Sequence, residues 1–200
     1  MIVVKGIIQR GLFTLVFGAL LLSPEETAAA PSISFRGERI VLTVLGDRIR
    51  VCGDYHFRNH ASEDASQRLF YPFPVDSLHP VPDTTSIETG GAPVPFRVGA
   101  RGVAFTAEVP AGSKRTYRIC YEQDCAVPEG CYILTTTAAW REPLVEADFE
   151  VIVPAGFELT HLSYEAEEGK RGDGATVYRF HRTRFLPDRD LCVKWRIALK

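Results

Sequence analysis

The sequence lacks every short motif that marks a common catalytic or nucleotide-binding site. It has no G-x-S-x-G nucleophile turn, no H-E-x-x-H zinc pair and no G-x-x-x-x-G-K-[ST] phosphate loop. It also lacks an excess of either charge, because 23 basic and 25 acidic residues give a net charge of −2. These absences argue against the enzyme classes that such motifs mark, and against binding to nucleic acid or to an anionic membrane surface.

No apolar run is long enough to span a bilayer, although a short one lies close to the N-terminus. Residues 11–22 are apolar, follow the two charges Lys5 and Arg10, and precede the small residues 28–30. This pattern predicts a signal peptide over residues 1–30. We therefore expect an exported protein, periplasmic or extracellular, that keeps no membrane attachment once the signal is cleaved.

Two features near the predicted cleavage site bear on whether the segment is instead an uncleaved membrane anchor or carries a lipid anchor. Glu25 and Glu26 are unusual there, so an uncleaved membrane anchor is the alternative to a signal peptide. The first cysteine is Cys52, which argues against a lipid anchor at the cleavage site. Removing two basic and two acidic residues with the signal leaves the net charge at −2, and residues 31–200 suit a single domain.

The sequence from Ile40 onward lacks a helical stripe of apolar residues and alternates with a period of two. Turn residues recur at short intervals, and a Val-Pro-Ala-Gly sequence follows an alternating run twice, in residues 105–122 and 149–165. We expect proline at the second position of each four-residue turn and glycine at the fourth. We expect an all-β protein, an antiparallel two-sheet β-sandwich of about nine or ten strands. Its predicted core holds Ile49, Val51, Tyr55, Phe57, Val103, Phe105, Ala107, Val109, Tyr117, Ile119, Tyr121, Leu191, Val193, Trp195, Ile197 and Leu199.

Five cysteines in an exported chain favour disulfides, with one cysteine left over. Cys125 and Cys131 bracket a short loop, so a bond between them is the natural interpretation. Cys52, Cys120 and Cys192 share the polar parity of their strands, and we expect one bond among these three, on the outer face of a sheet.

Other polar residues suggest sites only weakly. His56, His60 and His79 with Cys52 lack a recognisable metal-ligand spacing, so we predict no metal site and no cofactor. Arg171, Gly172 and Asp173 form a tripeptide that integrin ligands display, on a predicted hairpin tip. Ordinary turn chemistry explains the same residues, so they are a candidate recognition loop and no more.

The run Val-Pro-Ala-Gly-Ser-Lys-Arg-Thr-Tyr-Arg-Ile-Cys-Tyr-Glu-Gln, followed by Cys-Tyr-Ile-Leu-Thr-Thr-Thr and Ala-Asp-Phe-Glu-Val-Ile-Val-Pro, resembles a known β-sandwich family. It is similar to the VIT domain of inter-alpha-trypsin inhibitor heavy chains and vault proteins, and to exported bacterial domains of similar layout. The resemblance covers residues 50–162. It implies a sandwich fold and supplies no catalytic residue.

Three functional hypotheses remain open from the sequence. The first is an exported, non-enzymatic interaction or accessory module of the cell envelope, with an unidentified protein partner. The second is a hydrolase acting on an envelope polymer, whose site would assemble in three dimensions from Asp54, His56 and Arg58 with Glu122 or Lys194. The third is a thiol or metal-binding role for Cys52, Cys120 and Cys192.

Overall fold

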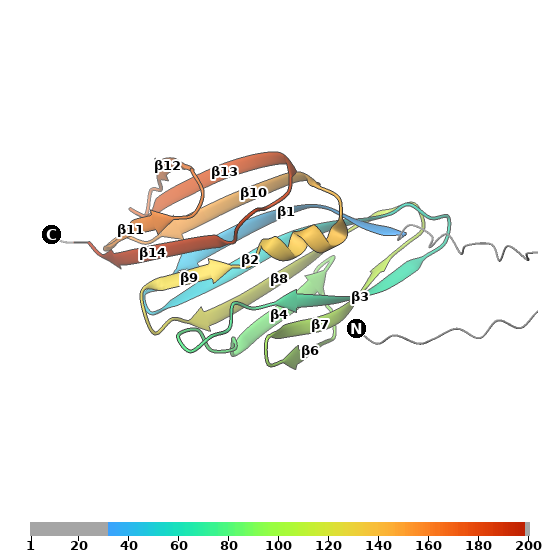
Figure 1. Cartoon of the computed structure of the whole chain (residues 1–200), viewed down its shortest axis with the longest axis horizontal. Coiled ribbons are helices and arrows are strands. Elements are labelled where there is room, and N and C mark those ends of the chain that lie inside the picture. Colours follow the sequence, from blue (N-terminus) through green and yellow to red (C-terminus); the bar gives the residue numbers. More distant parts are fainter. Residues whose placement is uncertain (1–31, 199–200) are drawn as a thin grey trace, which may run out of the picture. The chain divides into compact units, whose positions relative to one another are not determined.

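The computed structural model describes residues 32–198, and within them it places fourteen strands and one short 3-10 helix (Figure 1). The all-β prediction is confirmed. The predicted nine or ten strands were too few, because several strands have only two to four residues and are too short to show alternation. No helix within this range is long and apolar enough to cross a membrane. The predicted signal peptide, residues 1–30, lies outside the described residues.

The largest sheet has eight strands and forms one continuous layer. Every neighbouring pair in it is antiparallel except β1 and β10, which run parallel. In spatial order the strands are β12 (Glu167–Lys170), β13 (Thr176–Phe185), β10 (Leu144–Val153), β1 (Ile33–Val44), β2 (Arg48–Asn59), β8 (Lys114–Asp124), β4 (Thr84–Thr89) and β5 (Ala92–Pro93).

Two three-stranded sheets lie over one face of the large sheet, together with the 3-10 helix η1 (Thr135–Trp140) (Figure 1). One is ordered β11 (Phe157–Leu162), β14 (Leu191–Ile197), β9 (Glu129–Tyr132), and the other β3 (Ala65–Pro72), β7 (Gly102–Val109), β6 (Phe96–Gly99). Their inward side chains join those of the large sheet in one buried apolar cluster. Both β9 and β3 are edge strands of their sheets.

The period-two pattern predicted the core well. The predicted core residues of β2, β7 and β8 are all buried, as are Leu191, Val193 and Trp195 of β14. The prediction that Ile197 belongs to the core was wrong, because this last residue of β14 lies at the end of its sheet and is 73% exposed. Leu199 lies outside the described residues.

Both Val-Pro-Ala-Gly turns join strands of different sheets. The first links β7 to β8 and the second links β10 to β11, so each carries the chain from one layer to the other. In the first turn the amide of Ser113 donates to Pro110 O, and in the second the amide of Phe157 donates to Pro154 O. Proline is therefore the first turn residue, one position earlier than predicted, and glycine is the third, with positive φ in both copies.

The predicted cysteine pairing was half wrong. Cys52 is bonded to Cys120, a pair within the expected set of three, but Cys131 is bonded to Cys192 and Cys125 is free and buried. Each bonded pair stands directly opposite in register, on β2 with β8 and on β14 with β9. Cys125 and Cys131 do not meet because the chain leaves the large sheet after β8 and enters a small sheet at β9.

Candidate functional site

The polar residues proposed as a hydrolase site lie on the outer face of the large sheet, except Lys194. Asp54 pairs with Arg118 at 3.2 Å, and His56 Nδ1 lies 2.9 Å from the Thr116 hydroxyl. Glu122 pairs with Arg50 and with Arg48 on its own face. Lys194 is on β14 of a small sheet and pairs with Glu129. These groups line neither of the two cavities described below, and the structure does not bring them together.

One row of this outer face alternates in charge. Successive strands from β13 to β4 place in direct register His181, Asp148, Arg39, Asp54, Arg118 and Glu88. Directly opposed residues of opposite charge stabilise a sheet by a few tenths of a kcal/mol to about 1 kcal/mol per pair. Apart from His181, the row has two arginines and three carboxylates, so charges of the two signs nearly balance along it.

The four residues considered for metal binding lie at separate places. Cys52 is in a disulfide, and His60 hydrogen-bonds to Ser34 at 2.9 Å. His79 is buried, with Nδ1 2.8 Å from Asp76 and Nε2 3.0 Å from the Glu129 carbonyl oxygen. These bonds hold the loop that contains His79 against β9. No group of three or more potential ligands gathers anywhere in residues 32–198.

The structure does not support the hypothesis of a thiol or metal-binding role, because the three cysteines proposed for it, Cys52, Cys120 and Cys192, are all in disulfides. The free Cys125 has a thiol pKa raised to about 11, chiefly by burial, so it is protonated at neutral pH.

The tripeptide Arg171, Gly172 and Asp173 lies at the exposed turn between β12 and β13, as predicted. Arg171 pairs with Asp173 at 3.4 Å, and Asp173 accepts from the Ala175 amide at 3.1 Å. The aspartate thus serves the turn itself. Recognition by a partner stays a prediction.

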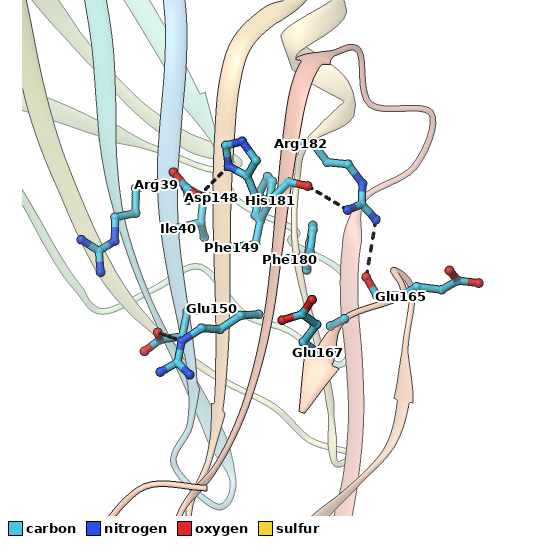
Figure 2. A pocket seen from close by; sticks show the side chains of 12 residues that line it. Arg39, Ile40, Asp148, Phe149, Glu150, Glu165, Glu167, Phe180, His181 and Arg182 are labelled. Atoms are coloured by element: carbon cyan, nitrogen blue, oxygen red, sulfur yellow. Dashed lines mark hydrogen bonds and ion pairs between the residues drawn. The ribbon is translucent and has the colours of Figure 1, made fainter. Parts of the chain in front are cut away.

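An open groove of about 860 Å³ runs along β10 and β13 beside the segment that leads into β12 (Figure 2). Several of its charged groups already have partners. Figure 2 shows His181 and Asp148 pointing toward each other, 2.8 Å apart, and Arg182 bonded to the His181 and Glu165 carbonyl oxygens. Glu150 accepts from Arg179 at 2.8 Å. Arg39, Glu165 and Glu167 also line the groove and have no ion pair among the described residues, so the groove is an open surface on which charges of both signs are exposed.

A second, smaller cleft lies where the covering layer is split. Its volume is about 340 Å³, and it opens between the edge strand β3 and the segment formed by β9 and η1. The large sheet supplies its floor, with Phe35, Glu38, Tyr55 and Phe57. Residues 69–72 of β3 form one wall, and Tyr132, Thr136, Ala139 and Trp140 form the other. We call this the aromatic cleft.

The aromatic residues of the floor and one wall support each other. The rings of Phe35 and Phe57 stack at 5.2 Å between centroids, and Trp140 lies against both at 5.8 and 5.6 Å. Such packing fixes the shape of the cleft before any ligand enters it. Most small-molecule sites are preformed apolar cavities of this kind, with few polar groups.

Glu38 is the exception in this apolar setting, and a β-bulge puts it there. The pairing of β1 with β2 shifts between Phe35 and Gly37, so the inward parity changes from odd to even numbers. Glu38 therefore points inward with Ile40, Leu42 and Val44, and it is 2% exposed. Among the described residues it is the one carboxylate in the buried set.

A chain of tyrosine hydroxyls ends at this carboxylate. Tyr132 donates to Glu38 Oε2 at 2.7 Å, Tyr55 and Tyr132 are 3.1 Å apart, and Tyr55 and Tyr71 are 2.9 Å apart. Each hydroxyl has one proton, so with Tyr132 donating to Glu38, Tyr55 donates to Tyr132 and Tyr71 donates to Tyr55. All three donors are then used, and Glu38 Oε1 has no partner in the described structure.

Burial sets the protonation of these groups. Desolvation raises the pKa of Glu38 from 4.5 to about 7, although the hydrogen bond from Tyr132 acts in the opposite direction. Burial also raises the pKa of Tyr55, Tyr71 and Tyr132 well above the usual value of 10. At neutral pH the tyrosines are neutral donors, and Glu38 changes charge near physiological pH.

The sequence analysis missed Glu38, Tyr132 and Trp140 as site residues, although one signal was present. Glu38 shares parity with the apolar Ile40, Leu42 and Val44, and an acidic residue in such a set marks either a buried group or an irregular strand. Tyr55 was predicted as core, and it is both core and part of the site.

Comparison with known proteins shows the fold alone. No family model and no curated protein matches the chain. A provisionally described nutrient-binding protein of Legionella pneumophila has a TM-score of 0.61 at 13% identity, over 83% of this chain and 67% of that one. An M1 zinc metallopeptidase of Deinococcus radiodurans, bound to a Tyr-Ser-Ala substrate, has a TM-score of 0.51 at 14% identity, over 82% of this chain.

A two-domain M1 zinc metallopeptidase bound to L-arginine is similar to the same degree, with a TM-score of 0.52 at 15% identity. This chain spans 42% of each peptidase chain. Identities this low say nothing about activity.

Proposed function

We propose that the chain is an exported, non-enzymatic binding module of the cell envelope that holds a small, mostly apolar molecule in the aromatic cleft. The observation that carries this proposal is a preformed apolar cavity whose floor contains a buried carboxyl group with an unpartnered oxygen. Buried polar atoms without partners are rare in proteins and mark sites where a ligand or water supplies the missing bond. Nutrient binding, the provisional description of the Legionella protein, is compatible with this role.

We infer that the three sheets act as a two-layer sandwich. The eight-stranded sheet is one layer, and the two small sheets with η1 are the other (Figure 1). The cleft is then the interruption of the second layer between β3 and β9. This explains why its floor consists of core positions of β1 and β2, where a continuous second sheet would have covered them.

Export is supported by the two disulfides, which persist in oxidising compartments. A non-enzymatic role is supported by the ion pairs that engage Asp54 and Glu122 on the outer face, and Asp148 and Glu150 in the open groove. The envelope-hydrolase alternative has no specific observation in its favour. The protein partner and the VIT resemblance stay predictions.

Binding of N-phenyl-1-naphthylamine, an apolar dye whose fluorescence rises in an apolar environment, tests the proposal. We expect saturable binding by the purified, oxidised protein. Ala139 is exposed at the rim of the cleft, so Ala139→Trp should obstruct it and weaken binding by about tenfold or more, the loss of about 1.4 kcal/mol. Ala138→Trp is the matched control, because Ala138 is exposed on the same helix but does not line the cleft.

The proposal fails if the dye does not bind, or if both tryptophan variants bind it as the parent protein does. Robust turnover in a panel of hydrolase substrates would also overturn it. Pull-downs from envelope extract, with and without the Ala139→Trp change, test whether a protein partner uses the same surface.

A further inference from the structure

Glu38 gives the aromatic cleft a charge preference that its walls alone lack. Among the residues that line the cleft, Glu38 is the single carboxyl group, and lysine, arginine and histidine are absent from that lining. When Glu38 is ionised, the negative charge is held in an apolar site with one hydrogen bond, from Tyr132. A buried charge with so few partners is costly, and an opposite charge placed beside it relieves that cost.

We propose that the aromatic cleft selects small molecules in which a protonated amine is attached to an aromatic or aliphatic body, with the ammonium group donating to Glu38 Oε1. This inference rests on the proposed function of the cleft. It names the class of ligand, and it assigns Glu38 as the group that discriminates between ligands.

Other ligand classes fit the same groups less well. A carboxylate ligand would face the charge of Glu38 in a site without a cation to separate the two. A neutral alcohol would donate one hydrogen bond to Oε1 without supplying the compensating charge, and hydrogen bonds to charged groups are the stronger kind. The rings of Phe35, Phe57 and Trp140 also favour a cation over a neutral group, because aromatic faces attract cations.

The groups around Glu38 leave its charge uncompensated. Tyr55 lies opposite it on β2, and Tyr132 and Tyr71 approach from the two small sheets; all three are neutral. On the other side Ala147 of β10 is its direct neighbour, and Arg182 of β13 follows. The Arg182 guanidinium lies over the Phe180 ring and bonds to backbone oxygens, as Figure 2 shows, so it is engaged elsewhere.

The test compares three probes with nearly the same skeleton: 2-phenylethylamine, 2-phenylethanol and 3-phenylpropanoate. Titration calorimetry at pH 8, where Glu38 is ionised, should show the amine binding about tenfold or more tighter than the alcohol, and the carboxylate weakest. Glu38→Gln should remove this difference, because it keeps the shape and loses the charge. Glu88→Gln, at an exposed carboxylate on the opposite face, should leave the order of affinities unchanged.

Proton release gives a second, independent measurement. Since the amine requires ionised Glu38, its binding at pH 6 should release close to one proton, and at pH 8.5 almost none, for a carboxyl pKa of about 7. Calorimetry in two buffers with different ionisation enthalpies measures the number of protons. Glu38→Gln should release none at either pH.

The outcomes separate this inference from the proposed function. If the naphthylamine dye binds and Ala139→Trp blocks it, but phenylethanol binds as well as phenylethylamine or Glu38→Gln changes nothing, the ligand class is wrong and the binding function stands. If neither the dye nor any phenyl probe binds, both proposals fall. A glutamine variant that unfolds is recognised by its dye binding and its circular dichroism, and the proton count on the parent protein then decides.

Discussion

Glu38 is the residue at which folding and binding make opposite demands. A core position beside Ile40 normally holds an apolar side chain, and a carboxyl group there carries a desolvation cost that the single hydrogen bond from Tyr132 only partly offsets. Such residues concentrate at functional sites, where a perturbed group is maintained for its chemistry. The cost is therefore measurable as a stability effect even without a ligand.

The first prediction at this scale concerns the pH dependence of folding. Glu38 keeps its proton up to about pH 7 in the folded protein and loses it near pH 4.5 when unfolded. Between these values folding takes up a proton, so the free energy of unfolding falls as pH rises from 4.5 to 7, by about 3 kcal/mol in total. Glu38→Gln should match the parent near pH 4.5 and exceed its stability by up to that amount at pH 8, in urea unfolding.

The exposed carboxylate variant Glu88→Gln is the control, and its unfolding curve should follow the parent at both pH values. Equal stability of the parent and Glu38→Gln at pH 8 would contradict the burial argument.

Gly53 is the second residue whose identity the cleft requires. An added Cβ would lie 2.3 Å from the Tyr55 hydroxyl oxygen and 2.7 Å from Ile40 Cδ1, because the Tyr55 ring covers this position on the inner face of β2. Gly53→Ala should displace that hydroxyl from Tyr71 and Tyr132, lower stability by about 1–3 kcal/mol and weaken dye binding. Gly172→Ala, in an exposed turn with no atom within 4 Å, should do neither. Chemical denaturation of both variants measures the difference.

At the scale of the elements, alternation was enough to locate most strands but not their partners. The inward residues of β2, β7 and β8 were predicted because each strand keeps one parity along its length. In β1 the bulge reverses the parity after Phe35, and neither half alone reveals the shift. The Val-Pro-Ala-Gly turns were located correctly, but a turn residue does not say whether the next strand stays in the sheet or crosses to another one.

The cysteines show the same limit. Cys131 alternates with the inward Tyr132, so its outward orientation was available from the sequence, as it was for Cys192. We expected Cys131 to bond to Cys125 because the two are close in the chain, and this expectation was wrong. Whether two outward cysteines meet depends on strand order, which is fixed by contacts between segments far apart in the sequence.

The aromatic cleft could not be predicted from the sequence for a related reason. It is bounded by β3 and by β9 with η1, which belong to different small sheets and face each other over β1 and β2. A gap between two edge strands leaves no local pattern in either strand. The aromatic residues that line it read as ordinary core positions, and by burial Tyr55 and Phe57 are core positions.

For the molecule as a whole, the two faces of the large sheet have separate roles. Its outer face has an alternating row of charges in direct register, which suits contact with water. Its inner face packs against the small sheets, and the cleft opens between them. The proposed function places the ligand in this cleft, where the floor is apolar and one carboxyl oxygen lacks a hydrogen bond.

The last prediction is that the fold depends on both disulfides, one in each layer. They close loops of 68 and 61 residues, and loop-closure entropy assigns each about 4 kcal/mol, comparable together to the 5–15 kcal/mol that stabilises a typical domain. The midpoint temperature of thermal unfolding should therefore fall steeply after full reduction. The paired changes Cys52→Ser with Cys120→Ser, or Cys131→Ser with Cys192→Ser, should each give part of that fall.

Cys125→Ala is the control, because the free thiol closes no loop and its loss removes only a small buried group. Peptide mapping without reduction should recover Cys131 joined to Cys192; a peptide joining Cys131 to Cys125, or a control as unstable as the paired variants, would refute this assignment.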